Sequence, residues 1–149
     1  MKEIKGDLWN YYGEKGFIVC ITTNGFLKKN GEAIMGRGCA LEAKTRFPEL
    51  PKLLGEKIRF FGNNVYELQS KKLWAFPVKH NWWEKADPDL VKKSAEQLAL
   101  HIKNREIEFG LHETFILPKP GCANGQLDWE DVKPLLKDLP DNVWVIDRP

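Results

Sequence analysis

Two short apolar runs, far apart in the chain, constrain its fold most strongly. Residues 17–21 and 114–117 are almost continuously apolar and show no alternation with polar positions. Such a run is typical of a strand that is buried on both faces, as in a parallel sheet covered by helices. The two runs therefore predict an α/β fold with a central, mostly parallel sheet.

Apolar runs alternate with helical patterns along the rest of the chain. We expect helices at residues 38–47, 88–103 and 129–136, the first of them ending before Pro48. The expected strands are residues 3–5, 17–22, 58–61, 65–68, 73–77, 114–117 and 143–146.

Three local signals refine these elements. Residues 62–64, Gly-Asn-Asn, predict a hairpin turn between two strands. Asp87, followed by proline, is a candidate N-cap for the second helix. Asp128 is a candidate cap for the third helix, where Pro134 predicts a 3₁₀ first turn and an α-helix from near Lys133.

Each of the two buried strands is followed by a glycine-rich loop. Residues 35–40 read Met-Gly-Arg-Gly-Cys-Ala, and residues 118–126 read Pro-Lys-Pro-Gly-Cys-Ala-Asn-Gly-Gln. Both loops precede a predicted helix, and an open α/β sheet binds ligands at the carboxyl ends of its strands. Backbone N–H groups of such loops bind anions. The pair predicts a clamp on a diphosphate, although ordinary turns are the alternative interpretation.

Composition excludes several classes of protein. We expect one domain, residues 1–149, with 42% apolar and 30% charged residues. A net charge of +2 does not by itself indicate a nucleic-acid binder. We expect no disulfide framework or metal site from the three cysteines, which form no Cys-x-x-Cys pair. No run approaches a membrane span or a signal peptide, so we expect a cytoplasmic protein without a membrane partner.

Four segments, taken in order, resemble the motifs of a macrodomain, the ADP-ribose-binding module. They are Gly-Asp-Leu at residues 6–8, Thr-Asn-Gly at 23–25, and the glycine-rich segments at 35–40 and 117–129. The resemblance runs from about Lys5 to Ile146. It implies a three-layer α/β/α fold with a mixed, mostly parallel sheet. Within the family, the chain looks closest to the branch of terminal ADP-ribose-protein glycohydrolases and DNA ADP-ribosyl glycohydrolase antitoxins.

The resemblance also implies how ADP-ribose is bound. The Asp7 carboxylate would accept a hydrogen bond from the adenine amino group, although a turn or cap residue is the alternative interpretation. Asn24 would lie near the distal ribose, and a plain Asn-Gly turn explains it nearly as well. The two glycine loops would hold the diphosphate, and Arg148 would stack on adenine. The full set of expected ligand-binding residues is Asp7, Leu8, Thr23, Asn24, Gly36, Arg37, Gly38, Pro118, Gly121, Cys122, Ala123, Asn124, Gly125 and Arg148.

The same resemblance implies Lys44 as the catalytic residue. It lies roughly 9 Å along the helix from Gly38, and a desolvated lysine with a lowered pKa can act as a nucleophile. A solvated helix lysine is the alternative. Protein-directed members of the branch carry an aspartate where this chain has Gly125. We therefore expect a mechanism that depends on the lysine without that aspartate, as in the DNA-directed members.

The expected function is removal of ADP-ribose from a nucleic acid or a protein, by a monomer that uses no metal and no cofactor. A reader that binds ADP-ribose without chemistry and a phosphatase on ADP-ribose-1″-phosphate are the alternatives. The adjacent Trp82 and Trp83 follow the basic Lys79 and His80. They either cover the edge of the sheet or form a platform that stacks on a base of a modified single strand.

Overall fold

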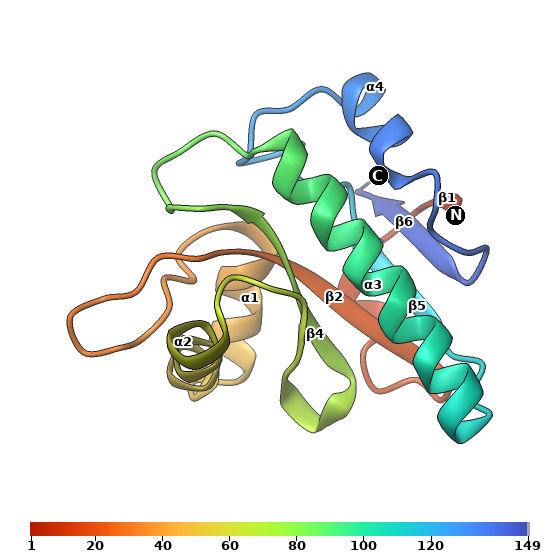
Figure 1. Ribbon diagram of the computed structural model, residues 1–149, viewed down its shortest axis with the longest axis horizontal. Coiled ribbons are helices and arrows are strands. Elements are labelled where there is room, and N and C mark those ends of the chain that lie inside the picture. The colour runs from red at the N-terminus through yellow and green to blue at the C-terminus, as the bar shows by residue number, and fades with distance from the viewer. Residues whose placement is uncertain (149) are drawn as a thin grey trace.

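The strand order of the central sheet, β1-β6-β5-β2-β4-β3, brings parallel strands from distant parts of the chain together (Figure 1). The computed structural model describes residues 1–148. Only β3 and β4 pair in the antiparallel sense among these residues; the other neighbouring strands are parallel. The strands are β1 (Lys2–Lys5), β2 (Phe17–Asn24), β3 (Tyr66–Glu67), β4 (Leu73–Lys79), β5 (Thr114–Pro118) and β6 (Val143–Asp147).

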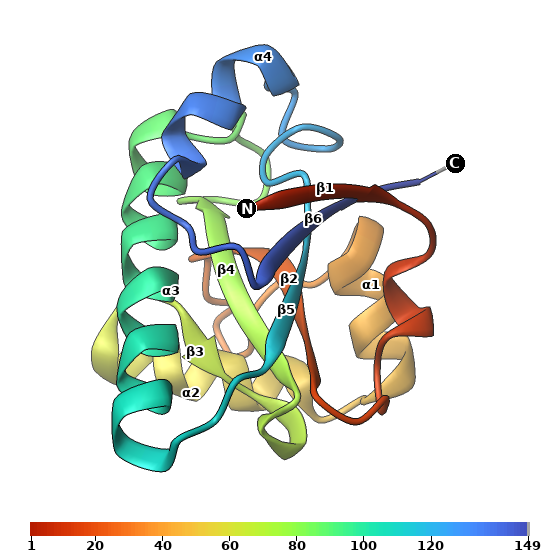
Figure 2. The same ribbon diagram turned by 90° about the vertical axis from the view of Figure 1, so that its right-hand side faces the viewer.

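Helices cover both faces of the sheet. Figure 2 shows α3 and α4 on one side of it and α1 on the other. Their apolar residues fall into two separate buried clusters, with α1 and α2 contributing to one and α3 and α4 to the other. The helices are α1 (Gly38–Arg46), α2 (Leu50–Phe61), α3 (Pro88–Phe109) and α4 (Trp129–Val132). This arrangement is the three-layer α/β/α fold expected from the sequence.

The position of β2 explains why polar and apolar residues do not alternate in its sequence. Ile18 and Cys20 point into the cluster under α3, while Val19 and Ile21 point into the cluster under α1 and α2. Each of these four residues is at most 1% exposed. Side chains that alternate between two buried faces must all be apolar, so the prediction of a doubly buried strand is confirmed.

One predicted strand and one predicted turn were wrong. Residues 58–61 form the last turn of α2, and no hairpin turn occurs at residues 62–64. Gly62 instead ends the helix, with φ at 91° and its N–H donating to the Ile58 carbonyl at 2.8 Å. A short apolar run does not distinguish a strand from one face of a helix. The other six strand predictions are confirmed, with ends that differ by one or two residues.

The predicted helix starting at residue 88 is longer than expected. It continues to Phe109 and ends at Gly110, whose φ of 64° is the left-handed conformation that favours glycine at a helix end. Asp87 caps its first turn as predicted, accepting a hydrogen bond from the Asp89 N–H at 2.9 Å.

The predicted order of helix types after Asp128 was wrong. The α-helical turn comes first, and a 3₁₀ turn, Lys133–Leu136, follows it. Asp128 occupies the N-cap position but its side chain makes no capping hydrogen bond. Pro134 explains the order, because a proline near the start of the second turn lacks the N–H that would continue the α-helix.

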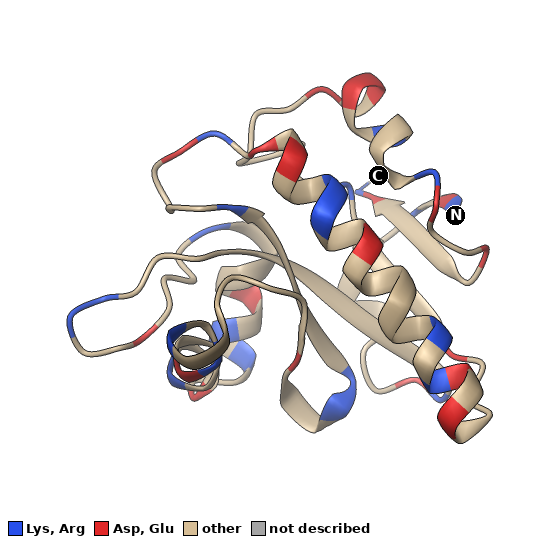
Figure 3. Ribbon diagram, in the orientation of Figure 1, with Lys and Arg blue, Asp and Glu red and all other residues tan. Residues whose placement is uncertain are grey.

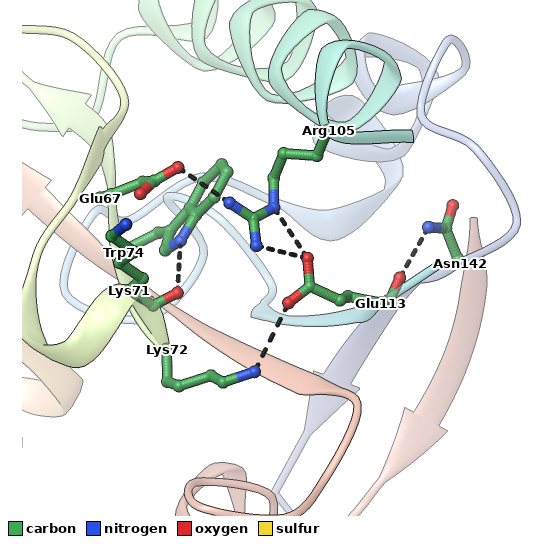
Figure 4. A network of polar contacts seen from close by, with 7 residues as sticks. All are labelled: Glu67, Lys71, Lys72, Trp74, Arg105, Glu113 and Asn142. Atoms are coloured by element: carbon green, nitrogen blue, oxygen red, sulfur yellow. Dashed lines mark hydrogen bonds and ion pairs between the residues drawn. The ribbon is translucent and has the colours of Figure 1, made fainter. Parts of the chain in front are cut away.

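Figure 4 shows a network of charged side chains. It lies where β4 and β5 begin, whereas the glycine-rich loops follow the carboxyl ends of the strands. The buried Glu113 carboxylate accepts hydrogen bonds from Arg105 of α3 at 2.7 Å and from Lys72 at 3.5 Å. Arg105 also donates to Glu67 of β3 at 3.2 Å. The network ties α3 to the β3–β4 hairpin, and we assign it a structural role.

Candidate functional site

A cavity of about 760 Å³ lies at the carboxyl ends of four strands. Asn24 of β2, Lys79 of β4, Pro118 of β5 and Asp147 of β6 all line it, and each lies at the end of its strand. This volume lies within the range of roughly 300–1,000 Å³ typical of small-molecule sites. Every expected ligand-binding residue except Asp7 lines this cavity. Their roles in binding stay predictions.

The two glycine-rich loops meet across the cavity. Gly38 has a φ of 54°, and a Cβ atom added there would lie only 2.9 Å from the Asn124 side-chain nitrogen of the other loop. The Gly36-Arg37-Gly38 segment leads directly into α1, whose first turn receives no side-chain hydrogen bond from its N-cap, Arg37. First-turn N–H groups of a helix have no partner within the helix and attract anions.

The second loop is folded tightly around Gly121 and Gly125. A Cβ atom at Gly125 would lie 2.4 Å from the Gly121 carbonyl oxygen, which real contacts do not allow. The same oxygen accepts a hydrogen bond from the Leu127 N–H at 2.9 Å. Gly121 has a φ of 78°. This loop conformation therefore excludes any side chain at residue 125, including the aspartate of the protein-directed branch.

Lys79 is a cavity residue that the sequence interpretation missed. It is the last residue of β4 and only 8% exposed, and its Nζ donates to the Trp82 carbonyl at 3.4 Å. Burial lowers the pKa of Lys79, and the nearby positive charge of Arg37 lowers it further. Within residues 1–148, Lys79 forms no salt bridge. A lowered pKa makes a larger fraction of the amine neutral than in an exposed lysine, and the neutral amine is the nucleophile.

The signal for Lys79 was present in the sequence. The rule that placed both glycine loops at the carboxyl edge of the sheet applies equally to the residue that ends β4. The expected strand stopped at Pro77, two residues short of Lys79.

Solved structures provide the comparison that decides the fold. The macrodomain of Thermus aquaticus DarG matches with a TM-score of 0.74 and 23% identity, over 98% of this chain and 97% of its own. The macrodomain of Mycobacterium tuberculosis DarG matches with a TM-score of 0.71 and 24% identity, over 99% of this chain and 96% of its own. No family model and no curated protein matches the sequence.

The chain has the macrodomain fold. A third match is the structure of Thermosipho africanus DarTG in complex with ADP-ribose, with a TM-score of 0.71 and 19% identity. It covers 99% of this chain, which spans only 42% of the DarTG chain. The macrodomain-like, three-layer architecture expected from the sequence is thus confirmed.

Asp7 lies beside the macrodomain cavity without lining it. Both of its neighbours, Gly6 and Leu8, line the cavity. The exposed Asp7 carboxylate accepts a hydrogen bond from the Trp9 N–H at 3.0 Å and so caps the 3₁₀ turn Leu8–Asn10. Asp7 therefore is a cap residue, and only one of its carboxylate oxygens is used in the cap. The other oxygen is available for the expected contact with adenine.

Asn24 holds the long connection between β2 and α1. Its amide donates to the Ile34 carbonyl at 3.0 Å and accepts from the Phe26 N–H at 3.0 Å. The turn-forming role is therefore present. Because Asn24 also lines the cavity, a contact with the distal ribose stays a prediction.

The structure places Lys44 away from the cavity. It lies on α1 with an exposed side chain, and it is not one of the lining residues, unlike Gly38, Cys39 and Ala40 of the same helix. Lys44 lies on the helix that begins at Gly38, as expected, but its position on that helix does not make it part of the cavity wall. By contrast, Lys79 at the end of β4 does line the cavity.

One of the two adjacent tryptophans lines the cavity, and the other packs against it. Trp82 lines the cavity and is 40% exposed, and Trp83 is 59% exposed. The two rings meet edge to face with centroids 5.6 Å apart, and Trp83 meets Phe26 in the same way at 5.3 Å. We call Phe26, Trp82 and Trp83 the aromatic ledge. Because both tryptophans are this exposed, we favour a binding role for the ledge over the interpretation that these rings only cover the edge of the sheet.

The two cavity cysteines are not built as nucleophiles. Burial raises the pKa of Cys39, and its sulfur contacts the Thr22 hydroxyl at 3.3 Å. Burial raises the pKa of Cys122 to about 11. Both thiols therefore stay protonated at neutral pH, whereas catalysis by cysteine needs the thiolate.

Two other cavity cations are paired. Lys119 contacts the Asp147 carboxylate at 3.1 Å, and Arg148 contacts Glu42 of α1 at 2.5 Å. Across the described part of the chain, no group of three or more His, Cys, Asp or Glu residues could hold a metal ion. The helices of residues 1–148 include none long and apolar enough to cross a bilayer.

Proposed function

We propose that this chain binds ADP-ribose and hydrolyses the bond that joins it to a macromolecule. The observation that carries the proposal is the buried Lys79 amine in a cavity closed by two glycine-rich loops. The macrodomain fold and the structure of Thermosipho africanus DarTG in complex with ADP-ribose support the choice of ligand.

The cavity offers a place for each part of ADP-ribose. Adenine would lie between Asp7 and Arg148, near the carboxyl end of β6. The diphosphate would lie between the loops, where Gly38 approaches Asn124. The distal ribose would then reach the ends of β2 and β4, where Lys79 lies. All of these walls come from one chain, so the proposed site needs only a monomer.

Lys79 would act as the nucleophile. Its neutral Nζ would attack C1″ of the distal ribose and form a C–N bond while the bond from C1″ to the acceptor breaks. The acceptor would leave with the bonding electron pair and take a proton from the new ammonium group. Water would then attack C1″ while the C–N bond breaks, and one proton of that water would pass to the nitrogen, which releases ADP-ribose and restores the amine.

Because residue 125 is glycine, Lys79 has no aspartate partner from the second loop in the proposed reaction. The second loop has no room for a carboxylate at this position, so the proposed reaction uses the lysine without an aspartate partner. Binding without turnover would instead identify a reader. Phosphate release from ADP-ribose-1″-phosphate would identify the phosphatase alternative.

Calorimetry with ADP-ribose, AMP and NAD tests the binding step. We expect ADP-ribose to bind at least about tenfold more tightly than AMP, because only ADP-ribose fills both the diphosphate and the distal ribose regions. The variant Gly38→Ala should weaken binding by about tenfold or more, because its Cβ would push aside the Asn124 side chain, which lines the cavity, and because a φ of 54° strains any residue other than glycine. No heat with ADP-ribose would overturn the proposal.

Gly13→Ala is the matched control for Gly38→Ala. Gly13 has a φ of 86°, and a Cβ atom added there meets nothing within 4 Å. It therefore carries a comparable backbone strain at a place that does not line the cavity. Equal losses of affinity in the two variants would show that strain, and not the cavity, explains the effect.

The proposed acceptor is a single-stranded nucleic acid. The aromatic ledge adjoins the cavity through Trp82, and exposed aromatic rings stack on bases. The exposed Lys28 and Lys29 form the tip of the same β2–α1 connection that carries Phe26, seen in blue in Figure 3. The connection is well anchored, since Ala33 N–H donates to Pro51 O of α2 at 2.8 Å. A preformed ledge loses little entropy on binding.

The double variant Trp82→Ala/Trp83→Ala tests the ledge. In a Lys79→Ala background that prevents turnover, we expect about tenfold weaker binding of an ADP-ribosylated single strand, as stacking contributes roughly 1–3 kcal/mol per base. Binding of free ADP-ribose should change by less than about twofold. Phe60→Ala, at a 70% exposed aromatic on α2, is the control. Unchanged binding of the modified strand would remove nucleic acid from the proposal.

A further inference from the structure

Asp87 contacts the residues on both sides of Lys79. Its N–H donates to the Val78 carbonyl at 2.9 Å, and its Oδ2 lies 2.8 Å from the His80 Nε2. Its Oδ1 caps α3 by accepting from the Asp89 N–H. One residue at the start of α3 therefore holds the chain just before and just after the cavity lysine.

The opposite side of the Lys79 backbone is fixed independently. The Gly25 N–H lies 3.1 Å from the Lys79 carbonyl and 3.2 Å from the His80 carbonyl. The Asn63 amide donates to the Lys79 carbonyl at 3.0 Å. The main chain of Lys79 is thus held on the β2 side, whereas its amine depends on a contact with the segment 80–87.

Residues 80–87 form a loop that the His80–Asp87 contact closes. The Nζ of Lys79 donates to the Trp82 carbonyl, which lies within this loop. A second contact, from the Asn81 amide to Glu84 at 2.7 Å, stiffens the loop inside the closure. If the loop opened, the carbonyl that the Lys79 amine uses would move with it.

We infer that His80 and Asp87 are positioning residues that hold the Lys79 amine in the cavity by closing the loop that carries the Trp82 carbonyl. This inference rests on the proposed role of Lys79. Neither His80 nor Asp87 is itself a lining residue of the cavity. The pair acts on the reaction only through Lys79 and Trp82.

Two properties suit the pair to this role. The hydrogen bond from His80 holds the pKa of Asp87 below its usual range, so Asp87 remains an acceptor across neutral pH. The His80 side chain is 57% exposed and that of Asp87 35%. A contact this exposed contributes little to the stability of the fold. Its removal should therefore leave a folded protein whose lysine is less well placed.

The variants His80→Ala and Asp87→Ser separate positioning from folding. Serine keeps the cap on α3 and loses the contact with His80. We expect each variant to lower kcat on an ADP-ribosylated strand by about tenfold with KM nearly unchanged, and the double variant to lose no more than either single one. His80→Gln, which restores a donor, should recover part of the rate. Additive losses in the double variant would overturn the inference.

A second measurement does not depend on turnover. The pKa of Lys79 can be followed by NMR of its ε-methylene group in protein with ¹³C-labelled lysine. A loosened loop lets water reach the amine, so we expect this pKa to rise towards the ordinary lysine value in both single variants. His112→Ala, at an exposed histidine remote from the cavity, is the control. An unchanged Lys79 pKa in both variants would overturn the inference, even if the wild type proved to be a reader without turnover.

Discussion

Replacing Lys79 by alanine is expected to slow the release of ADP-ribose from a modified strand by about a hundredfold or more. Removal of a nucleophile lowers kcat without removing the groups that bind the ligand. We therefore expect ADP-ribose affinity to change by less than about threefold. The measurement is release of ADP-ribose from modified DNA, RNA and protein, followed for the wild type and the variant under single-turnover conditions.

Lys44→Ala is the matched control for Lys79→Ala. Both variants remove one lysine, but Lys44 is exposed on α1 and lies outside the cavity wall, whereas Lys79 is buried in it. We expect Lys44→Ala to keep the wild-type rate within about twofold. A wild-type rate in Lys79→Ala with a loss in Lys44→Ala would reverse the assignment and restore the role that the sequence suggested.

The pH dependence of the reaction provides an independent test of Lys79. Because burial and Arg37 lower its pKa below the ordinary lysine value, a larger fraction of the amine is neutral at a given pH. Only the neutral amine attacks, so kcat should rise with pH up to the lowered pKa and level off above it. Arg37→Ala removes one positive charge, so the rise should move to higher pH. A rate that shows no rise anywhere in the pH range below the ordinary lysine pKa would contradict this role.

The variant Gly125→Asp is expected to abolish ADP-ribose binding rather than to install a second catalytic residue. The new Cβ would overlap the Gly121 carbonyl oxygen at 2.4 Å, so the loop must refold around it. We expect at least about a hundredfold weaker binding and a lower melting temperature, because steric overlap with backbone cannot be relieved by side-chain rotation. Calorimetry and thermal unfolding measure the two effects.

Ala123→Asp controls for the added charge. Residue 123 lies in the same loop and lines the cavity, but its side chain is exposed. It should repel the diphosphate to a similar degree and leave the melting temperature nearly unchanged. If Gly125→Asp unfolded no earlier and bound no more weakly than Ala123→Asp, then the loop would have room for an aspartate, and the lysine-only proposal would lose its physical basis.

The doubly buried strands could be predicted because burial leaves a local record in the sequence. Ile18 and Val19 face opposite layers, and both must be apolar whatever the rest of the chain does. The glycine loops could be predicted for a similar reason, since a φ of 54° at Gly38 and 78° at Gly121 favours glycine in any context. Once the strands were parallel, chain direction alone placed both loops at one edge.

The helix α2 was missed, because an apolar run at its end also fits a strand. Its buried residues Leu50, Leu54 and Ile58 follow a helical spacing, but the apolar residues 58–61 at its end match a strand equally well. Gly55 packs against the Gly31 backbone of the β2–α1 connection, where an added Cβ would lie 2.0 Å from the Gly31 oxygen. The helical spacing was therefore present in the sequence, and the contact of Gly55 with the Gly31 segment decides where this helix packs.

The sequence by itself determined the α/β architecture, the edge of the sheet that holds the site, and the two glycine loops in the wall of that site. Each of these follows from local burial, backbone conformation or chain direction. Only the tertiary structure decided which of Lys44 and Lys79 lies in the cavity. In the sequence, nothing about the two lysines themselves shows which one is buried. The desolvation of an amine depends on the segments that pack around it. For Lys79, those segments come from β2, the first glycine loop and the loop that leads into α3.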